Sequence, residues 1–145
     1  SGFGLEDIFV FDLPDNMQAD EISELELEII TQKIGEEVVL KNVIFAFNSY
    51  ALEQSSFVEL DKLIVYLKKN PDLEIEIQGH TDDVGNDREN HILSEQRANI
   101  VFEYLTLRVN NTLRHKGFGE SVPLANNDTE EGRAINRRTS FVVIQ

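Results

Sequence analysis

Cysteine is absent from the 145 residues of this chain, which removes several classes of site at once. Without a thiol there is no disulfide, no thiolate zinc site and no cysteine nucleophile. No run of about 18 apolar residues occurs either, so the sequence predicts no membrane-spanning helix. Positive charge is scarce, with 13 Lys and Arg against 27 Asp and Glu and a formal net charge of −14. Because Lys and Arg are what bind phosphates, we expect neither nucleic acid nor anionic lipid as a partner.

Common catalytic signatures are also missing. The chain contains no GxSxG, Walker or GxGxxG pattern and no HExxH motif, and His91 and His115 do not stand at metal-ligand spacing from His80. We therefore expect no catalysis, no metal and no cofactor. One enzymatic alternative stays open, a metal-assisted amidase or peptidase that would use His80, Asp82 and Asp83.

The length suits one compact domain with a short extension. Residues 1–36 differ from the rest, because Leu25, Leu27 and Ile29 alternate there with glutamates in too short a stretch for a domain. We interpret residues 1–36 as the tail of a preceding module and a linker, and residues 37–145 as the domain. The chain starts at Ser1 without Met or a signal-like apolar segment, so we expect a fragment whose targeting signal is missing.

From residue 37 onward, strand patterns alternate with helix patterns. Apolar alternation and β-branched or aromatic residues predict strands at 38–47, 73–77, 113–118 and 139–144. Helical spacing predicts helices at 56–69 and 90–108, the first opened by a capping box from Ser56 to Glu59, and residues 121–133 are expected to form a loop. The predicted class is α/β (an α+β sandwich) in the order βαβαβ-β, with a mixed sheet and two main helices packed on it.

Two charged residues have the most informative positions. Arg97 falls within the apolar stripe of the second helix, between Leu93 and Val101, where a buried guanidinium requires an anionic partner. Asp82 lies just past the carboxyl end of a predicted strand, where open α/β sheets commonly bind ligands. The two residues either pair with each other or face one ligand that carries an ammonium and a carboxylate. Arg97 could also extend its charged end to solvent, and Asp82 could be an ordinary loop or capping residue.

Further polar residues stand near these two in the sequence. Thr81 and Asn90 flank Asp82, and Arg137 and Arg138 directly precede the last predicted strand. The two terminal arginines fit a pocket role and a purely solvated role about equally well.

An ordered set of motifs then points to one family. The motifs are Asn42-Val43-Ile44-Phe45-Ala46-Phe47, Asn70-Pro71, Gly79-His80-Thr81-Asp82, Gly85, Asn90, Leu93-Ser94, Arg97-Ala98, Val101, Tyr104-Leu105, Gly117-Phe118-Gly119-Glu120, Pro123, Asn127, Thr129-Glu130-Glu131-Gly132-Arg133 and Asn136-Arg137-Arg138. Over residues 37–145 this order and spacing resemble the OmpA-like C-terminal domain family, which includes peptidoglycan-associated lipoproteins and flagellar stator subunits. Arg108 to Thr112 depart from the family pattern after the second helix, where a Gly-Ile pair is usual.

The resemblance implies a non-catalytic module that binds peptidoglycan through the diaminopimelate residue of the stem peptide and anchors an outer-membrane-associated protein to the cell wall. It implies that Asp82 receives the ligand ammonium and that Arg97 holds the carboxylate in a bidentate fork. Asn90 matches a position that helps to fix the peptide, and Thr81 and the loop around Asn48 line the pocket. Arg137 and Arg138 match the family's terminal arginine pair.

The resemblance also implies a periplasmic location, with outer-membrane association through a part of the parent protein outside this chain. Residues 1–36 faintly resemble the segment that precedes such domains in multidomain envelope lipoproteins, including some linked to type IX secretion. A third class of function stays open, a protein–protein module with an envelope partner in which Asp82 and Arg97 form only an internal ion pair.

Overall fold

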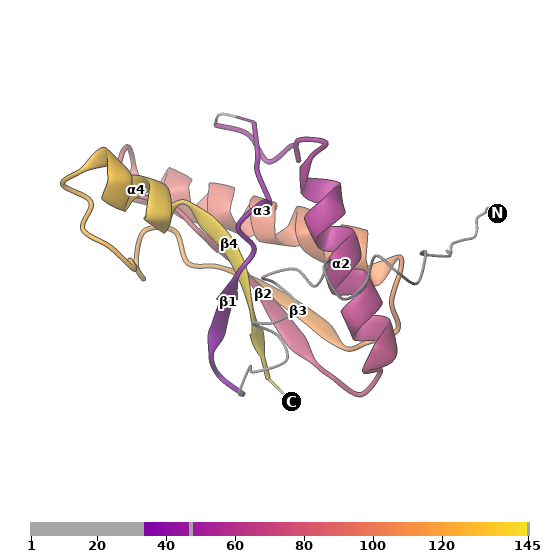
Figure 1. The fold of residues 1–145 in the computed structure, drawn as a ribbon. Coiled ribbons are helices and arrows are strands. Elements are labelled where there is room, and N and C mark those ends of the chain that lie inside the picture. Colours follow the sequence, from indigo (N-terminus) through magenta and orange to yellow (C-terminus); the bar gives the residue numbers. More distant parts are fainter. Residues whose placement is uncertain (1–33, 47, 145) are drawn as a thin grey trace.

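The computed structural model describes residues 34–46 and 48–144, and the predictions for residues 1–33 lie outside this range. The elements follow one another as β1 (Glu37–Val39), α2 (Ser56–Lys69), β2 (Ile75–His80), α3 (Asp87–Thr106), β3 (Leu113–Gly117), α4 (Glu130–Asn136) and β4 (Arg138–Val143). They form one mixed sheet with α2 and α3 packed on it, and α4 lies beyond one end of the sheet (Figure 1). The predicted α/β class with two main helices is confirmed.

The four strands of the sheet run in the order β1-β4-β2-β3. Within the described part of the chain, β2 and β3 are the one parallel pair, whereas β4 lies antiparallel to both β1 and β2. The sequence pattern allowed an antiparallel last strand, but it did not reveal that this strand separates β1 from β2. The core lies between the helices and the sheet, where Leu63 of α2 and Val101 of α3 meet Ile77 of β2 and Phe141 of β4.

Several predicted boundaries are wrong. The first strand ends at Val39 instead of continuing to residue 47, because the chain turns at Lys41 and forms only an isolated bridge from Phe45 to Leu52. Ser56 does not cap α2, since its hydroxyl accepts a hydrogen bond from the backbone N–H of Ile44 and donates one to the Ile44 carbonyl. These two hydrogen bonds hold the chain after β1 against the start of α2.

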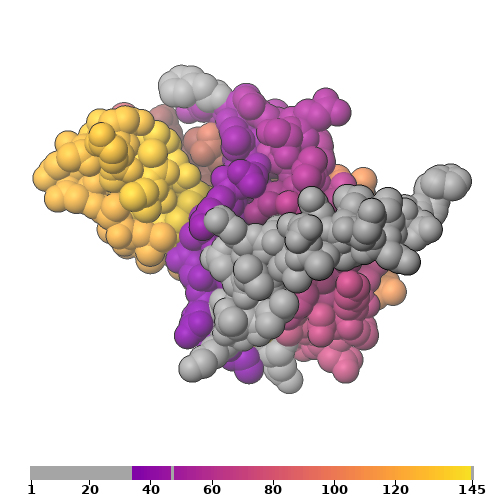
Figure 2. All heavy atoms as spheres, in the orientation of Figure 1, coloured from indigo at the N-terminus to yellow at the C-terminus, as the bar shows by residue number. Residues whose placement is uncertain are grey.

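The loop predicted at residues 121–133 contains the start of α4. Its N-cap is Thr129, whose hydroxyl accepts a hydrogen bond from the N–H of Gly132, and acidic residues occupy its first turn. In the space-filling view, α4 and the loop before it form a lobe at one end of the molecule (Figure 2). The helix therefore brings the segment before β4 to the end of the sheet at which β2 terminates.

Candidate functional site

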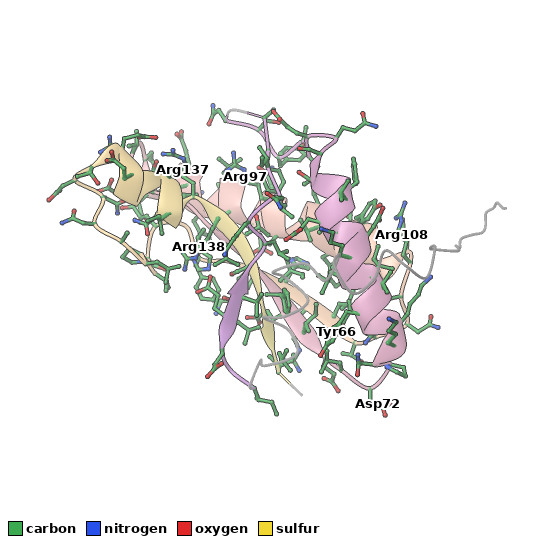
Figure 3. All side chains as sticks on the ribbon, viewed as in Figure 1. Tyr66, Asp72, Arg97, Arg108, Arg137 and Arg138 are labelled. Carbon is green, nitrogen blue, oxygen red and sulfur yellow. The ribbon has the colours of Figure 1, made fainter. Side chains whose placement is uncertain are left out.

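A pocket of about 920 Å³ opens at the end of the sheet where β2 terminates. Arg97, Arg137 and Arg138 gather at this end of the molecule, far from Arg108 and Asp72 at the other (Figure 3). The charged lining is predominantly basic, although the whole chain is acidic. Its members are Lys41, Arg97, Arg133, Arg137, Arg138, Asp82, Glu89 and Glu130. A locally basic pocket favours a ligand that carries at least one anionic group.

Asp82 lies in a loop whose shape is fixed by its own hydrogen bonds. The Asp82 Oδ1 atom accepts the N–H of Val84 at 3.0 Å, and the Thr81 hydroxyl donates to the Asp82 carbonyl at 2.8 Å. Asn90 donates through Nδ2 to the Val84 carbonyl at 2.9 Å and to Glu120 at 3.2 Å. Asp82 and Thr81 are buried, so the loop presents a carboxylate that is largely shielded from water.

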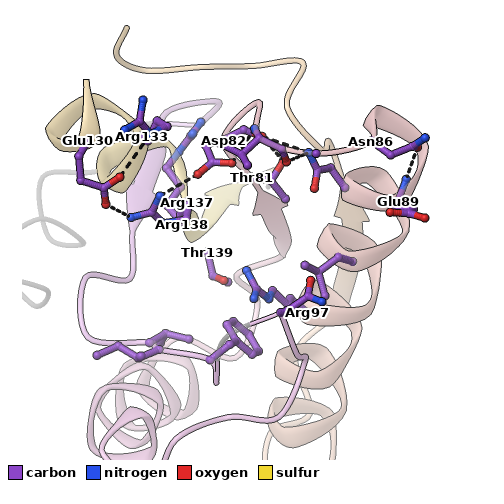
Figure 4. A pocket seen from close by; sticks show the side chains of 18 of the residues that line it. Thr81, Asp82, Asn86, Glu89, Arg97, Glu130, Arg133, Arg137, Arg138 and Thr139 are labelled. Carbon is purple, nitrogen blue, oxygen red and sulfur yellow. Dashed lines mark hydrogen bonds and ion pairs between the residues drawn. The ribbon is translucent and has the colours of Figure 1, made fainter. Parts of the chain in front are cut away.

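Arg97 reaches the pocket from the third turn of α3. Its Nε–H donates to the Ser49 carbonyl at 2.8 Å, and its guanidinium carbon lies 5.0 Å from the centre of the Phe45 ring. The guanidinium points into the pocket (Figure 4), and within the described residues no hydrogen bond or ion pair engages its Nη1 and Nη2 atoms. Burial lowers the pKa of Arg97 and the charge of Arg137 adds to this effect, whereas the Asp82 carboxylate opposes it.

The partner of Asp82 is Arg137, directly after α4. Arg137 Nη1 lies 2.7 Å from Asp82 Oδ2, and Arg137 Nη2 lies 2.7 Å from Glu130 Oε2 (Figure 4). The hydrogen bonds to Glu130 and Asp82 raise the pKa of Arg137. The interpretation of Asp82 and Arg97 as an internal ion pair is therefore wrong, because a different arginine holds the carboxylate.

Arg138 also lines the pocket, but its charge is neutralised on β1. Its Nε atom lies 2.7 Å from Glu37 Oε2, its Nη2 atom donates to the Val122 carbonyl at 3.0 Å, and the residue is buried. Next to this pair, His80 is buried and stacked on Phe118. Burial and the charge of Arg138 lower the pKa of His80 to about 4, although Glu37 opposes the shift.

The structure brings all the residues predicted from the sequence to this one pocket. Thr81, Asp82, Asn90, Arg97, Arg137 and Arg138 line it together with Asn48. Asn48 is exposed and has a positive φ of 51°, a conformation that asparagine adopts more readily than most residues.

Sequence reasoning missed several contributors to the site, and three of them contact the predicted arginines. Glu130 holds Arg137, the Ser49 carbonyl holds Arg97, and the Phe45 ring lies under the Arg97 guanidinium. The acidic first turn of a capped helix would have indicated Glu130 if α4 had been predicted. A backbone carbonyl such as that of Ser49 leaves no signal in a sequence.

Comparison with known proteins agrees with this geometry. The model of the OmpA family matches residues 44–137. The chain belongs to the OmpA family.

Several OmpA-family relatives share more than a third of their aligned residues with the chain. Outer membrane porin F of Pseudomonas aeruginosa is 39% identical over 105 residues, which are 70% of this chain and 30% of the porin. Peptidoglycan-binding protein ArfA of Mycobacterium tuberculosis is 37% identical over 103 residues, which are 70% of this chain and 32% of ArfA. The chain thus spans about a third of the length of these relatives.

Solved structures of other proteins share the fold of this chain. The peptidoglycan-associated lipoprotein of Burkholderia pseudomallei superposes with a TM-score of 0.63 at 33% identity, over 70% of this chain and 87% of the lipoprotein. The periplasmic domain of Helicobacter pylori MotB superposes with a TM-score of 0.63 at 22% identity, over 74% of this chain and 73% of that domain, and supports the fold alone. The family resemblance and the OmpA-like fold predicted from the sequence are both confirmed.

Proposed function

We propose that residues 37–145 bind peptidoglycan without cleaving it, by holding the diaminopimelate residue of the stem peptide between Asp82 and Arg97. The observation that carries the proposal is the Arg97 guanidinium, which is anchored through Nε and offers both Nη atoms to the pocket that Asp82 also lines. The side chain of diaminopimelate ends in a carbon that bears an ammonium and a carboxylate. A carboxylate in a hydrogen-bonded loop and a guanidinium on α3 complement such a centre.

The family relatives support the same proposal. ArfA is named as a peptidoglycan-binding protein, and the lipoprotein of Burkholderia pseudomallei is named as peptidoglycan-associated. We place the domain in the periplasm, where it would anchor an outer-membrane-associated parent protein to the cell wall. None of the helices in the described part of the chain has the length and apolar character needed to cross a membrane.

Co-sedimentation with purified peptidoglycan tests the proposal. We expect the wild-type protein to co-sediment and Asp82→Ala to lose binding by about 2–5 kcal/mol, because the ligand ammonium would then lack its counterion. Asp83→Ala is the matched control, since it removes an exposed acid from the same loop. Undiminished pull-down by folded Asp82→Ala would contradict the assignment.

A pair of stem peptides tests the ligand itself. The peptides differ only at the third position, with diaminopimelate in one and lysine in the other, and lysine lacks the extra carboxylate. We expect the lysine peptide to bind at least about 30-fold more weakly, since Arg97 would lose its ligand partner. Equal affinities would show that Arg97 does not recognise the carboxylate.

The hydrolase alternative has its own test. Among residues 34–46 and 48–144, no group of three or more His, Cys, Asp and Glu side chains is placed to hold a metal ion. We expect purified muropeptides to stay intact in mass spectra after incubation with the protein, with or without chelator. Cleavage that the chelator abolishes would replace the binding proposal with a metal-dependent hydrolase.

A further inference from the structure

Both carboxylate oxygens of Asp82 are already engaged by groups of the protein itself. Oδ1 accepts the N–H of Val84 at 3.0 Å, and Oδ2 lies 2.7 Å from Arg137 Nη1. The Asp82 side chain is 11% exposed, so water competes only weakly for it. A ligand ammonium that approaches Asp82 therefore meets a carboxylate that already has a cation.

Arg137 has a second carboxylate available to it. Its Nη2 atom lies 2.7 Å from Glu130 Oε2, at the first residue of α4. The Arg137 side chain is 40% exposed and follows the end of α4, so it can move without disturbing the core. If the guanidinium leaves Asp82, it keeps one of its two ionic partners.

We propose that Arg137 determines ligand specificity, because it occupies Asp82 until a ligand that carries both an ammonium and a carboxylate displaces it. The inference rests on the proposed function. A ligand with an ammonium alone replaces the Arg137 guanidinium on Asp82 with another cation. Three positive groups then lie close together: the ligand ammonium, Arg97 and the displaced Arg137. A zwitterionic ligand also brings a carboxylate, which neutralises the charges of Arg97 and of the displaced Arg137.

The electrostatics of the pocket agree with this role. Burial lowers the pKa of Arg97 most, the charge of Arg137 lowers it further, and the Asp82 carboxylate opposes both effects. Arg137 therefore disfavours positive charge at Arg97, which also lines the pocket. A carboxylate placed between them offsets this effect, whereas an additional ammonium increases it. Arg137 thus penalises the lysine peptide more than the diaminopimelate peptide.

Arg137→Gln provides the direct test, read by calorimetry with the same two stem peptides. Without the competing guanidinium, we expect the lysine peptide to bind about two- to fivefold more tightly, as befits a partly exposed ion pair. The diaminopimelate peptide should gain less, so that the ratio of the two affinities falls. An unchanged or weaker affinity for the lysine peptide, or an unchanged ratio, would overturn the inference.

Glu130→Gln should act in the opposite direction. It leaves Arg137 with Asp82 as its one ionic partner among the described residues. The lysine peptide should therefore bind this variant more weakly than the wild-type protein. Glu131→Gln removes the same charge from the next residue, which is exposed and does not line the pocket, and so controls for the general loss of negative charge. A change of the same sign in Glu130→Gln and Arg137→Gln, or an equal effect of Glu131→Gln, would contradict the competition.

Asp82→Ala separates the failure of this inference from that of the proposed function. If wild-type protein binds the diaminopimelate peptide and Asp82→Ala does not, an unchanged ratio in Arg137→Gln defeats the specificity role alone. If the wild-type protein binds neither peptide, or Asp82→Ala binds as well as wild type, both ideas fail. Thermal denaturation of each variant confirms that it is folded before the affinities are compared.

Discussion

At the scale of single residues, Arg97 shows why a guanidinium suits this site better than an ammonium. One edge of its planar group is held by the Ser49 carbonyl and one face lies near Phe45, which leaves the far edge for a ligand. A lysine ammonium is a point charge on a differently shaped stem, with no Nε–H to anchor it. Position 97 therefore needs the shape and hydrogen-bond donors of a guanidinium as well as its positive charge.

We expect Arg97→Lys to weaken binding of the diaminopimelate peptide by at least about tenfold, or 1.4 kcal/mol. The measurement is calorimetry against the wild-type protein. Arg114→Lys, an exposed substitution on β3, serves as the control for the general effect of an Arg-to-Lys change. Wild-type affinity in Arg97→Lys would mean that the forked geometry is unimportant.

The sequence predicted which residues line the pocket, but it did not predict which of them form ion pairs with one another. The positions of Asp82 after a strand and of Arg97 in a helix predicted a shared pocket, because the ends of strands and the starts of helices come together in such folds. The pairing of Asp82 with Arg137 depends on α4 and on the register of β4, which no local pattern encodes. The sequence also did not distinguish Arg137 from Arg138, whereas in the structure Arg137 pairs with Asp82 and Arg138 with Glu37.

At the scale of elements, the approach of α3 to the sheet fixes the site. A Cβ atom on Gly79 of β2 would overlap the backbone carbonyl of Ser94, and one on Gly117 of β3 would overlap the backbone of Glu95. The side-chain contacts agree, since Ser94 Oγ accepts the N–H of Gly119 at 2.8 Å. The same helix carries Asn90 and Arg97, so its distance from the sheet sets their positions in the pocket.

We expect Gly79→Ala to lower the free energy of unfolding by about 2–3 kcal/mol, because the new methyl group forces α3 away from the sheet. Peptide affinity should fall with it, since Arg97 moves with the helix. Gly85→Ala is the comparison: it has open space around it but a φ of +90°, so only its backbone conformation is penalised, by roughly 1–2 kcal/mol. Chemical denaturation measures the free energy of unfolding of both variants. Equal decreases in Gly79→Ala and Gly85→Ala would contradict a role for close packing at Gly79.

Elements with strong periodicity were predicted well, and those held by tertiary contacts were not. The two long helices and β2 have regular apolar spacing, so their existence was predictable. The extent of β1 was not, because the chain turns at Lys41 and the Ser56 hydroxyl binds the backbone N–H and carbonyl of Ile44. The α4 segment was missed because its loop is ordered by the buried side chain of Asn136, which bonds with Leu124, Ala125 and Asn127.

At the scale of the whole molecule, a buried charge cluster joins three strands. Arg138 of β4 pairs with Glu37 of β1, and His80 of β2 lies 3.9 Å from the same carboxylate. Burial raises the pKa of Glu37, but the hydrogen bonds and charge of Arg138 outweigh this and lower the pKa overall. Among the described residues, both ring nitrogens of His80 lack a hydrogen-bond partner.

This cluster predicts that stability falls in mild acid. The pKa of His80 is about 4 in the folded protein and 6.5 ordinarily, so the unfolded chain binds a proton that the folded protein rejects between these values. The free energy of unfolding should therefore fall as pH drops from 6.5 to 4, by about 2–3 kcal/mol from this residue.

The measurement is chemical denaturation across this pH range. His80→Gln should lose the corresponding part of the pH dependence, whereas His91→Gln, at an exposed position, should retain it. Parallel curves for wild-type protein and His80→Gln would show that His80 does not cause the acid sensitivity.

The central position of β4 has a consequence for the order of events during synthesis. Among the described residues, β1 is made before the other strands, but the strand that pairs with it, β4, is made last, and the Arg138–Glu37 pair closes a separation of 101 residues. Contacts between such distant segments slow folding, because the intervening chain must be ordered before they form. Until residues 138–143 are available, the edges of β1 and β2 that later bind β4 lack that partner. The edges at which the incomplete sheet could associate with another chain are thus covered only when the last strand has been made.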